Sequence, residues 1–150
     1  MNRSQDERVA ILKRLREMLE RQRSRFQRYQ TLMELQQAAI GDGDLEALDN
    51  QLVAERELLA DLAAVHRVIV PLRDLIDRRG ITLTEEVANL DRSVERLRSQ
   101  VSRHHRSNRE LLSRRTKELS ERIEAVDLPR RPVRVFRRND AAGGMIDLSL

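Results

Sequence analysis

The apolar residues of the first forty positions repeat every seven residues. The repeat, with two residues at intermediate positions, consists of Leu12, Leu15, Leu19, Phe26, Tyr29, Met33 and Ile40. This spacing places them on one stripe of a helix, so we predict a helix over residues 4–40. Gln22 and Gln36 occupy the remaining seam positions, where they weaken the seam but can fix its register. A rod of about 50 Å with so charged an outer face needs partner helices to be stable.

Two of the five glycines lie together at the end of this helix, in Ile40-Gly41-Asp42-Gly43-Asp44-Leu45. We predict that Gly41 takes the left-handed conformation that closes the first helix. Asp44 can cap the next helix, because its carboxylate can accept the free backbone N–H groups of the first turn. A stop and a start this close together predict two long helices folded back as an antiparallel pair.

A second apolar seam begins immediately after this turn. It consists of Leu45, Leu48, Leu52, Leu59 and Leu62, and it continues less regularly to Ile76. Glu55 interrupts the series. Pro71 lacks a backbone donor, so we predict a kink or a break near residues 68–71. Arg78, Arg79 and Gly80 then mark the end of the helix.

The third helix has two apolar segments separated by a polar one. Thr82 and Thr84 are both candidate N-caps, and we favour Thr84. Residues 102–109 contain no apolar side chain, so a continuous helix would have a polar and poorly packed middle. The apolar positions before and after it are Val87, Leu90, Val94, Leu97 and Val101, then Leu112, Thr116, Leu119, Ile123 and Val126.

The end of the chain departs from the helical pattern. Pro129 and Pro132 permit only extended chain, and residues 133–136 alternate like a short strand. Residues 145–150 are apolar again after a glycine-containing turn, so they have something to cover or to bind. We therefore predict an all-α fold: a long antiparallel helical hairpin with a third long helix, as in a coiled-coil-like bundle. The predicted helical domain is 1–127, and 128–150 is a flexible, irregular C-terminal tail.

Composition supports this architecture. Charged residues make up 36% of the chain and aromatic residues 2%, which suits long amphipathic helices with a narrow buried seam. The net charge of +4 is small beside 29 basic and 25 acidic residues, so we interpret most charges as solvated helix faces. No apolar run approaches a membrane span, and the N-terminus lacks the apolar core of a signal peptide. The absence of cysteine is consistent with a reducing cytoplasm.

The residues that usually carry chemistry are sparse. His66 falls on the second seam, where a core or boundary role is expected. His104 and His105 are adjacent and point about 100° apart on a helix, so they are poorly placed to chelate one metal. Asp42 and Asp44 lie between glycines, but the following residues do not continue a calcium loop. We expect no enzymatic activity, no metal, no cofactor and no small-molecule substrate.

Two surfaces could bind macromolecules. Residues 98–115 contain six arginines and one acidic residue, Glu110. They include no Phe, Tyr or Trp side chain on which a nucleic-acid base could stack. Nucleic-acid binding therefore ranks low. The stripe of Leu112, Leu119, Ile123 and Val126 could instead offer a partner a helix-binding groove. The alternative is that the first two helices simply cover this stripe in a three-helix bundle.

The order of these elements resembles the FlgN family of flagellar type III export chaperones over about residues 10–126. The resembling features are a long first helix, the joint around Gly43-Asp44-Leu45, and the Glu- and Leu-rich second helix with Glu55-Arg56-Glu57-Leu58-Leu59. The third helix adds an Asn-x-x-Leu-Leu-like element, which here is Asn108-Arg109-Glu110-Leu111-Leu112. The tail departs from the family, because Pro-Arg-Arg-Pro and Gly-Gly segments replace its aromatic-containing end.

The resemblance implies a cytoplasmic chaperone. Its clients would be the C-terminal amphipathic helices of hook-associated (hook–filament junction) proteins, which it would keep unassembled and deliver to the export gate. Self-association remains open. A coiled-coil structural or adaptor protein is the alternative, and a basic nucleic-acid-associated protein ranks third. The implied partner-binding residues are Asn108, Leu111, Leu112, Leu119, Ile123 and Val126, with Val133, Val135 and Phe136 in the tail.

Overall fold

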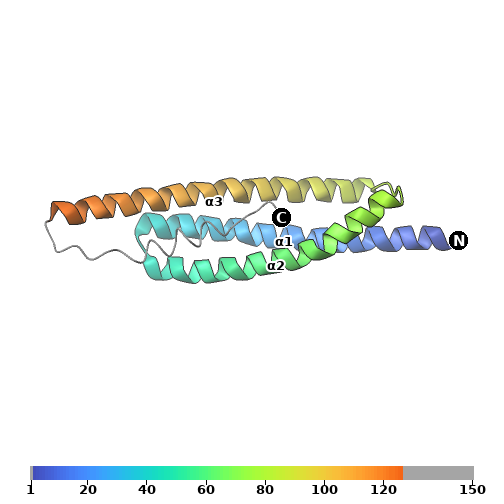
Figure 1. Cartoon of the computed structure of the whole chain (residues 1–150), viewed down its shortest axis with the longest axis horizontal. Coiled ribbons are helices and arrows are strands. Elements are labelled where there is room, and N and C mark those ends of the chain that lie inside the picture. Colours follow the sequence, from blue (N-terminus) through green and yellow to red (C-terminus); the bar gives the residue numbers. More distant parts are fainter. Residues whose placement is uncertain (1, 127–150) are drawn as a thin grey trace.

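The chain forms three long helices, α1 (Arg3–Asp42), α2 (Leu45–Arg78) and α3 (Glu85–Ala125). The structure is a computed structural model that describes residues 2–126, and within that range it contains no strand. Figure 1 shows the three helices side by side along one long axis. The predicted all-α fold is confirmed. The predicted tail over residues 128–150 lies outside the described residues.

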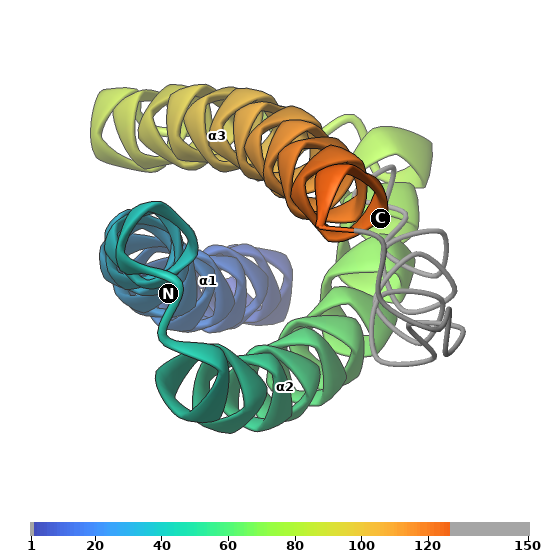
Figure 2. The same cartoon turned by 90° about the vertical axis from the view of Figure 1, so that its left-hand side faces the viewer.

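The helix α1 is the centre of the assembly. α2 and α3 each pack mainly against α1, and the end-on view in Figure 2 shows them curving around it. α2 runs antiparallel to α1, as the hairpin prediction required. α3 runs parallel to α1, because Arg16 contacts Glu86 near one end of the pair and Gly41 contacts Arg115 near the other. Every buried seam therefore meets α1.

The predicted seam of α1 forms the main core. Its apolar residues from Leu12 to Met33 meet apolar side chains from α2 and α3 in one continuous cluster, whereas Ile40 belongs to a second, smaller cluster. The most completely buried members of this core are Leu15, Met18, Leu19, Tyr29, Met33, Val94 and Val101. Burial of an aliphatic or aromatic side chain stabilises a fold by roughly 1.5–3 kcal/mol, so this seam accounts for the long helices being stable together.

The glycine that ends α1 is not the one predicted from the sequence. α1 continues through Gly41, and Gly43 takes the left-handed conformation, with φ of 70°. The reason is the position of the backbone bonds: the Gly43 and Asp44 amides donate to the carbonyls of Ile40 and Ala39 and close the last turn there. The predicted cap is confirmed, because the Asp44 carboxylate accepts a 3.1 Å hydrogen bond from the Ala47 amide.

The predicted end of α2 and start of α3 are also confirmed. α2 passes through Pro71 without a break and bends in its second half toward the start of α3 (Figure 1). Gly80 follows with φ of 59°. Thr84 is the N-cap of α3, and its hydroxyl accepts a hydrogen bond from the Val87 amide.

The middle of α3 corrects a second expectation. The apolar-free segment 102–109 is continuous helix, and it is not poorly packed. His105 and Asn108 point into the interior and are 9% and 3% exposed. They lie one turn and two turns after the fully buried Val101, so polar side chains continue the seam that the apolar ones began.

Candidate partner-binding site

The buried core ends where α3 passes the turn between α1 and α2. A small cluster of Ala39, Ile40 and Leu48 closes the hairpin. Leu111 and Leu112 of α3 are only partly buried against it. Ten further residues of α3 follow Arg115, whose side chain contacts Gly41, and they extend about 15 Å past the turn (Figure 1). We call residues 116–125 the α3 overhang.

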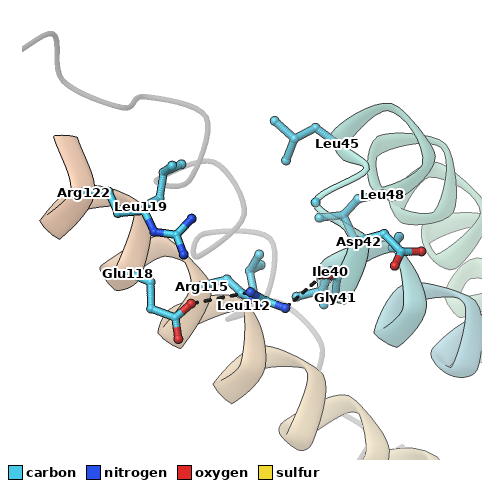
Figure 3. Close-up of a pocket in the computed structure, with 12 residues that line it drawn as sticks. Ile40, Gly41, Asp42, Leu45, Leu48, Leu112, Arg115, Glu118, Leu119 and Arg122 are labelled. Atoms are coloured by element: carbon cyan, nitrogen blue, oxygen red, sulfur yellow. Dashed lines mark hydrogen bonds and ion pairs between the residues drawn. The ribbon is translucent and has the colours of Figure 1, made fainter. Parts of the chain in front are cut away.

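A hollow of about 300 Å³ lies between the overhang and the turn. Figure 3 shows Leu45, at the start of α2, and Leu119, on the overhang, pointing into the space between the helices. These two leucines are 47% and 44% exposed, and both line the hollow. Leu112 and Leu48 lie deeper in the same hollow. The structure thus leaves an apolar recess open at the end of the hairpin.

Charged residues form the rim of the hollow. The Arg115 guanidinium donates a 3.0 Å hydrogen bond to the Gly41 carbonyl and lies 3.6 Å from the Glu118 carboxylate (Figure 3). Arg122 on α3 and Asp42 on α1 complete the rim. The Arg115 bond links α3 to the end of α1 at the edge of the hollow.

The apolar stripe of the overhang continues beyond the hollow. Ile123 is half-buried and Val126, at the C-cap of α3, is 64% exposed. With Leu119 they are spaced four and three residues apart, which places them on one face of the helix. None of the three belongs to a core cluster of the described residues. The three-helix bundle therefore does not cover the whole predicted stripe, and an exposed apolar stripe rimmed by charge is typical of an interaction site.

A buried polar cluster holds α3 in this position. Glu55, which the sequence presented only as an interruption of a seam, is 2% exposed. The Tyr29 hydroxyl donates a 2.6 Å hydrogen bond to one of its oxygens, and the Gln36 amide donates a 3.1 Å bond to the other. Burial, together with the negative charge of Glu55, raises the pKa of Tyr29, so the phenol stays protonated and remains a donor.

Two residues of α3 complete the cluster. The His105 Nε2 atom lies 3.6 Å from the Glu55 carboxylate, and burial lowers the pKa of this imidazole although Glu55 opposes the shift. The Asn108 amide donates a 2.9 Å hydrogen bond to the Met33 carbonyl. Such directional contacts set the axial position of α3 more narrowly than apolar packing does, because a shifted helix would leave buried polar groups unpaired.

The structure separates the predicted partner-binding residues into three groups. Asn108 is buried against α1, so it positions the helix and is not on the surface. Leu111 and Leu112 lie at the edge of the hairpin core. Leu119 and Ile123 are on the overhang, and Val126 is its C-cap. Val133, Val135 and Phe136 lie outside the described residues.

The sequence did not identify Leu45 as a site residue. Its seven-residue spacing from Leu52 and Leu59 placed it on the second seam, and only its proximity to a capped turn hinted that it lies at the end of the core. The remaining candidate chemistry stays sparse. The described residues contain no group of three or more side chains that could hold a metal ion, and His66 is half-buried. None of the helices described is long and apolar enough to cross a membrane.

Comparison with known proteins shows sequence similarity to a bacterial protein. No family model matches it, and no solved structure matches it. It is 31% identical over 143 residues to an uncharacterized protein of Treponema pallidum (strain Nichols), and the match spans 95% of this chain and 92% of that protein. A match of this length includes all three helices and most of residues 127–150. The chain therefore belongs to the same protein family as this Treponema pallidum protein.

Proposed function

We propose that this protein is a chaperone that binds an amphipathic helix of a client protein on the α3 overhang and in the adjoining hollow. One observation carries the proposal: Leu119 on the overhang and Val126 at its C-cap are exposed where α3 extends past its own bundle, beside an apolar recess that nothing in residues 2–126 fills. The protein acts by binding and not by catalysis.

The geometry suits helix-in-groove recognition. The overhang presents a stripe of apolar side chains, and Leu45 at the turn provides a second contact across the hollow. A client helix with apolar residues at three- and four-residue spacing could lie along this stripe and insert a side chain between Leu45 and Leu119. Because the stripe is short and bordered by Arg115, Glu118 and Arg122, binding can be reversible, as release of a client requires.

The resemblance to the FlgN family specifies the client. We propose that the clients are the C-terminal amphipathic helices of hook-associated junction proteins, which are prone to assemble through those same helices. The chaperone would cover them in the cytoplasm and deliver them to the flagellar export gate. In this proposal Leu119 and Ile123 make the central contacts with the client. Leu111, Leu112 and Val126 flank them. The resemblance to the FlgN family adds three tail residues to the client contacts: Val133, Val135 and Phe136.

The test is binding of a peptide that contains such a C-terminal helix, measured by titration calorimetry with the full chain. Leu119→Asp and Ile123→Asp should each weaken binding by about tenfold or more, because each removes an apolar contact of roughly 1.5 kcal/mol or more from the interface. Circular dichroism should show unchanged helix content, since Leu119 is 44% exposed and contributes little to the core.

Val9→Asp is the matched control. Val9 is 62% exposed on α1, about 48 Å from Gly41 along the helix, so its replacement should leave client affinity unchanged. Undiminished binding by Leu119→Asp would refute the overhang as the site. Binding of unrelated amphipathic helices with equal affinity would favour the adaptor function, and it would remove the flagellar assignment.

A further inference from the structure

The hollow has a candidate occupant in the same chain. Residues 145–150, Met-Ile-Asp-Leu-Ser-Leu, carry four apolar side chains, and they follow α3 in the sequence. We propose that this segment docks in the hollow between Leu45, Leu112 and Leu119 and covers it when no partner is bound. If the proposed function holds, a client must displace the segment, so the contact regulates the site.

The length of the chain permits this contact. Nineteen residues lie between Ala125 and Met145. The twenty Cα–Cα steps across them reach up to roughly 65 Å when the chain is extended. The hollow is lined by α3 residues from Arg122 back to Leu112, which lie about 5–20 Å from the end of the helix. Pro129 and Pro132 prevent the helix from simply continuing away from the hairpin. Gly143 and Gly144 allow the chain to reverse immediately before the apolar segment.

The chemistry of the two surfaces is complementary. Leu45 and Leu119 present exposed apolar surface. The apolar side chains of the segment, which are Met145, Ile146, Leu148 and Leu150, gain free energy when they are buried against such a surface. Asp147 stands among these apolar residues. Arg122 lies on the rim of the hollow, three residues after Leu119 on α3, so a cation stands beside the recess for this carboxylate.

The linkage between segment and hollow favours an intramolecular contact. A segment tethered by a linker of this length has an effective local concentration of about a millimolar, so even a weak apolar contact is populated. The match to the Treponema pallidum relative spans 95% of the chain and includes most of residues 127–150. The relative therefore shares most of the sequence that follows α3.

The experiment is disulfide trapping, which the absence of native cysteine makes specific. One variant carries Glu118→Cys, on the rim of the hollow, with Ser149→Cys. The matched control carries Lys117→Cys with Ser149→Cys; Lys117 is exposed on the opposite face of α3, at the same distance from the tail. Under mild oxidation we expect the Glu118→Cys/Ser149→Cys variant to form its intramolecular disulfide about tenfold faster than the control.

Two further variants test the apolar contact itself. Addition of Leu119→Asp or of Ile146→Asp to the rim variant should lower its rate to that of the control, while circular dichroism shows the same helix content. Equal rates in the rim variant and the control would overturn the proposal. Disulfide-linked pairs of chains in place of a closed monomer would overturn it in favour of a second copy of the chain as the occupant.

The trapping result is independent of the client. If the rim variant closes faster than the control and no client peptide binds, the tail contact stands and the chaperone function fails. If client peptide binds and slows closure of the rim variant, both hold. If client binds to the overhang and closure shows no preference for the rim, the chaperone function stands and the tail contact is refuted.

Discussion

A single acid in an apolar seam shows how context decides the role of a residue. Glu55 interrupts a leucine repeat, and an isolated carboxylate in a core would cost several kcal/mol. Here Tyr29 and Gln36 from α1 donate to its two oxygens, and His105 from α3 approaches to 3.6 Å. The carboxylate thus joins all three helices at one level, directly before the point where α3 leaves the core.

His105 makes the stability of this junction depend on pH. Burial lowers its pKa below the ordinary value of 6.5; Arg109 on α3 adds to the lowering, and Glu55 on α2 opposes it. The folded chain therefore binds this proton less tightly than the unfolded chain does. As the pH falls through 6.5, the unfolded state gains the proton first, and the free energy of unfolding decreases.

We expect His105→Gln to remove this component. Urea unfolding followed by circular dichroism at about pH 7.5 and about pH 5.5 should show a smaller loss of stability in the variant than in the original chain. His66 and His104 are present in both proteins and serve as internal controls. An equal loss in the two proteins would contradict the role assigned to His105.

At the scale of the elements, the α1–α2 turn depends on one glycine and not on the other. Gly43 has φ of 70°, in the left-handed region that disfavours any side chain. Gly41 is helical, and a Cβ atom built there meets no atom within 4 Å. Asp44 then begins α2 through its hydrogen bond to the Ala47 amide.

The two glycines should respond to alanine in opposite directions. Gly43→Ala should destabilise the fold by roughly 1–2 kcal/mol, because alanine is strained in the left-handed conformation. Gly41→Ala should stabilise it by roughly 0.5–1 kcal/mol, because alanine loses less conformational entropy in a helix. Urea unfolding midpoints measure both, and each variant is the control for the other. If Gly41→Ala destabilises the fold, Gly41 and not Gly43 is the left-handed residue that ends α1, as the sequence predicted.

At the scale of the whole molecule, the exposed end of α3 follows from an axial offset between the helices. α3 lies parallel to α1 and starts beside Arg16, so the two helices end at different levels. The same offset buries Val101 completely and leaves Leu119 at 44% exposure. One helix therefore serves as core in its first part and as surface in its last part.

This division predicts a gradient of protection along α3. Amides between residues 94 and 108 lie in the packed part, whereas no residue between 116 and 125 belongs to a core cluster. Hydrogen exchange followed by mass spectrometry should show slow exchange in the first group and markedly faster exchange in the overhang. A bound client should slow exchange in the overhang alone. Equal protection in both groups without client would mean that the overhang is covered.

The sequence by itself determined the helices. Seven-residue apolar spacing, the capping residues Asp44 and Thr84, and the stop at Gly80 are local signals, because they concern one helix face or one turn of backbone. They were sufficient to predict three helices and the hairpin. They did not distinguish Gly41 from Gly43, since both glycines can adopt the left-handed conformation and only the backbone bonds to Ala39 and Ile40 select one.

Only the tertiary structure decided which apolar residues remain exposed. Periodicity identifies the face of a helix that seeks a partner, but it contains no information on how far along its axis the partner lies. That offset arises from contacts between distant residues, such as Asn108 with Met33 and Arg115 with Gly41. They bury Asn108, which the sequence had suggested as a partner-binding residue, against α1. They also leave Leu45 and Leu119 facing an open hollow, where the proposed site lies.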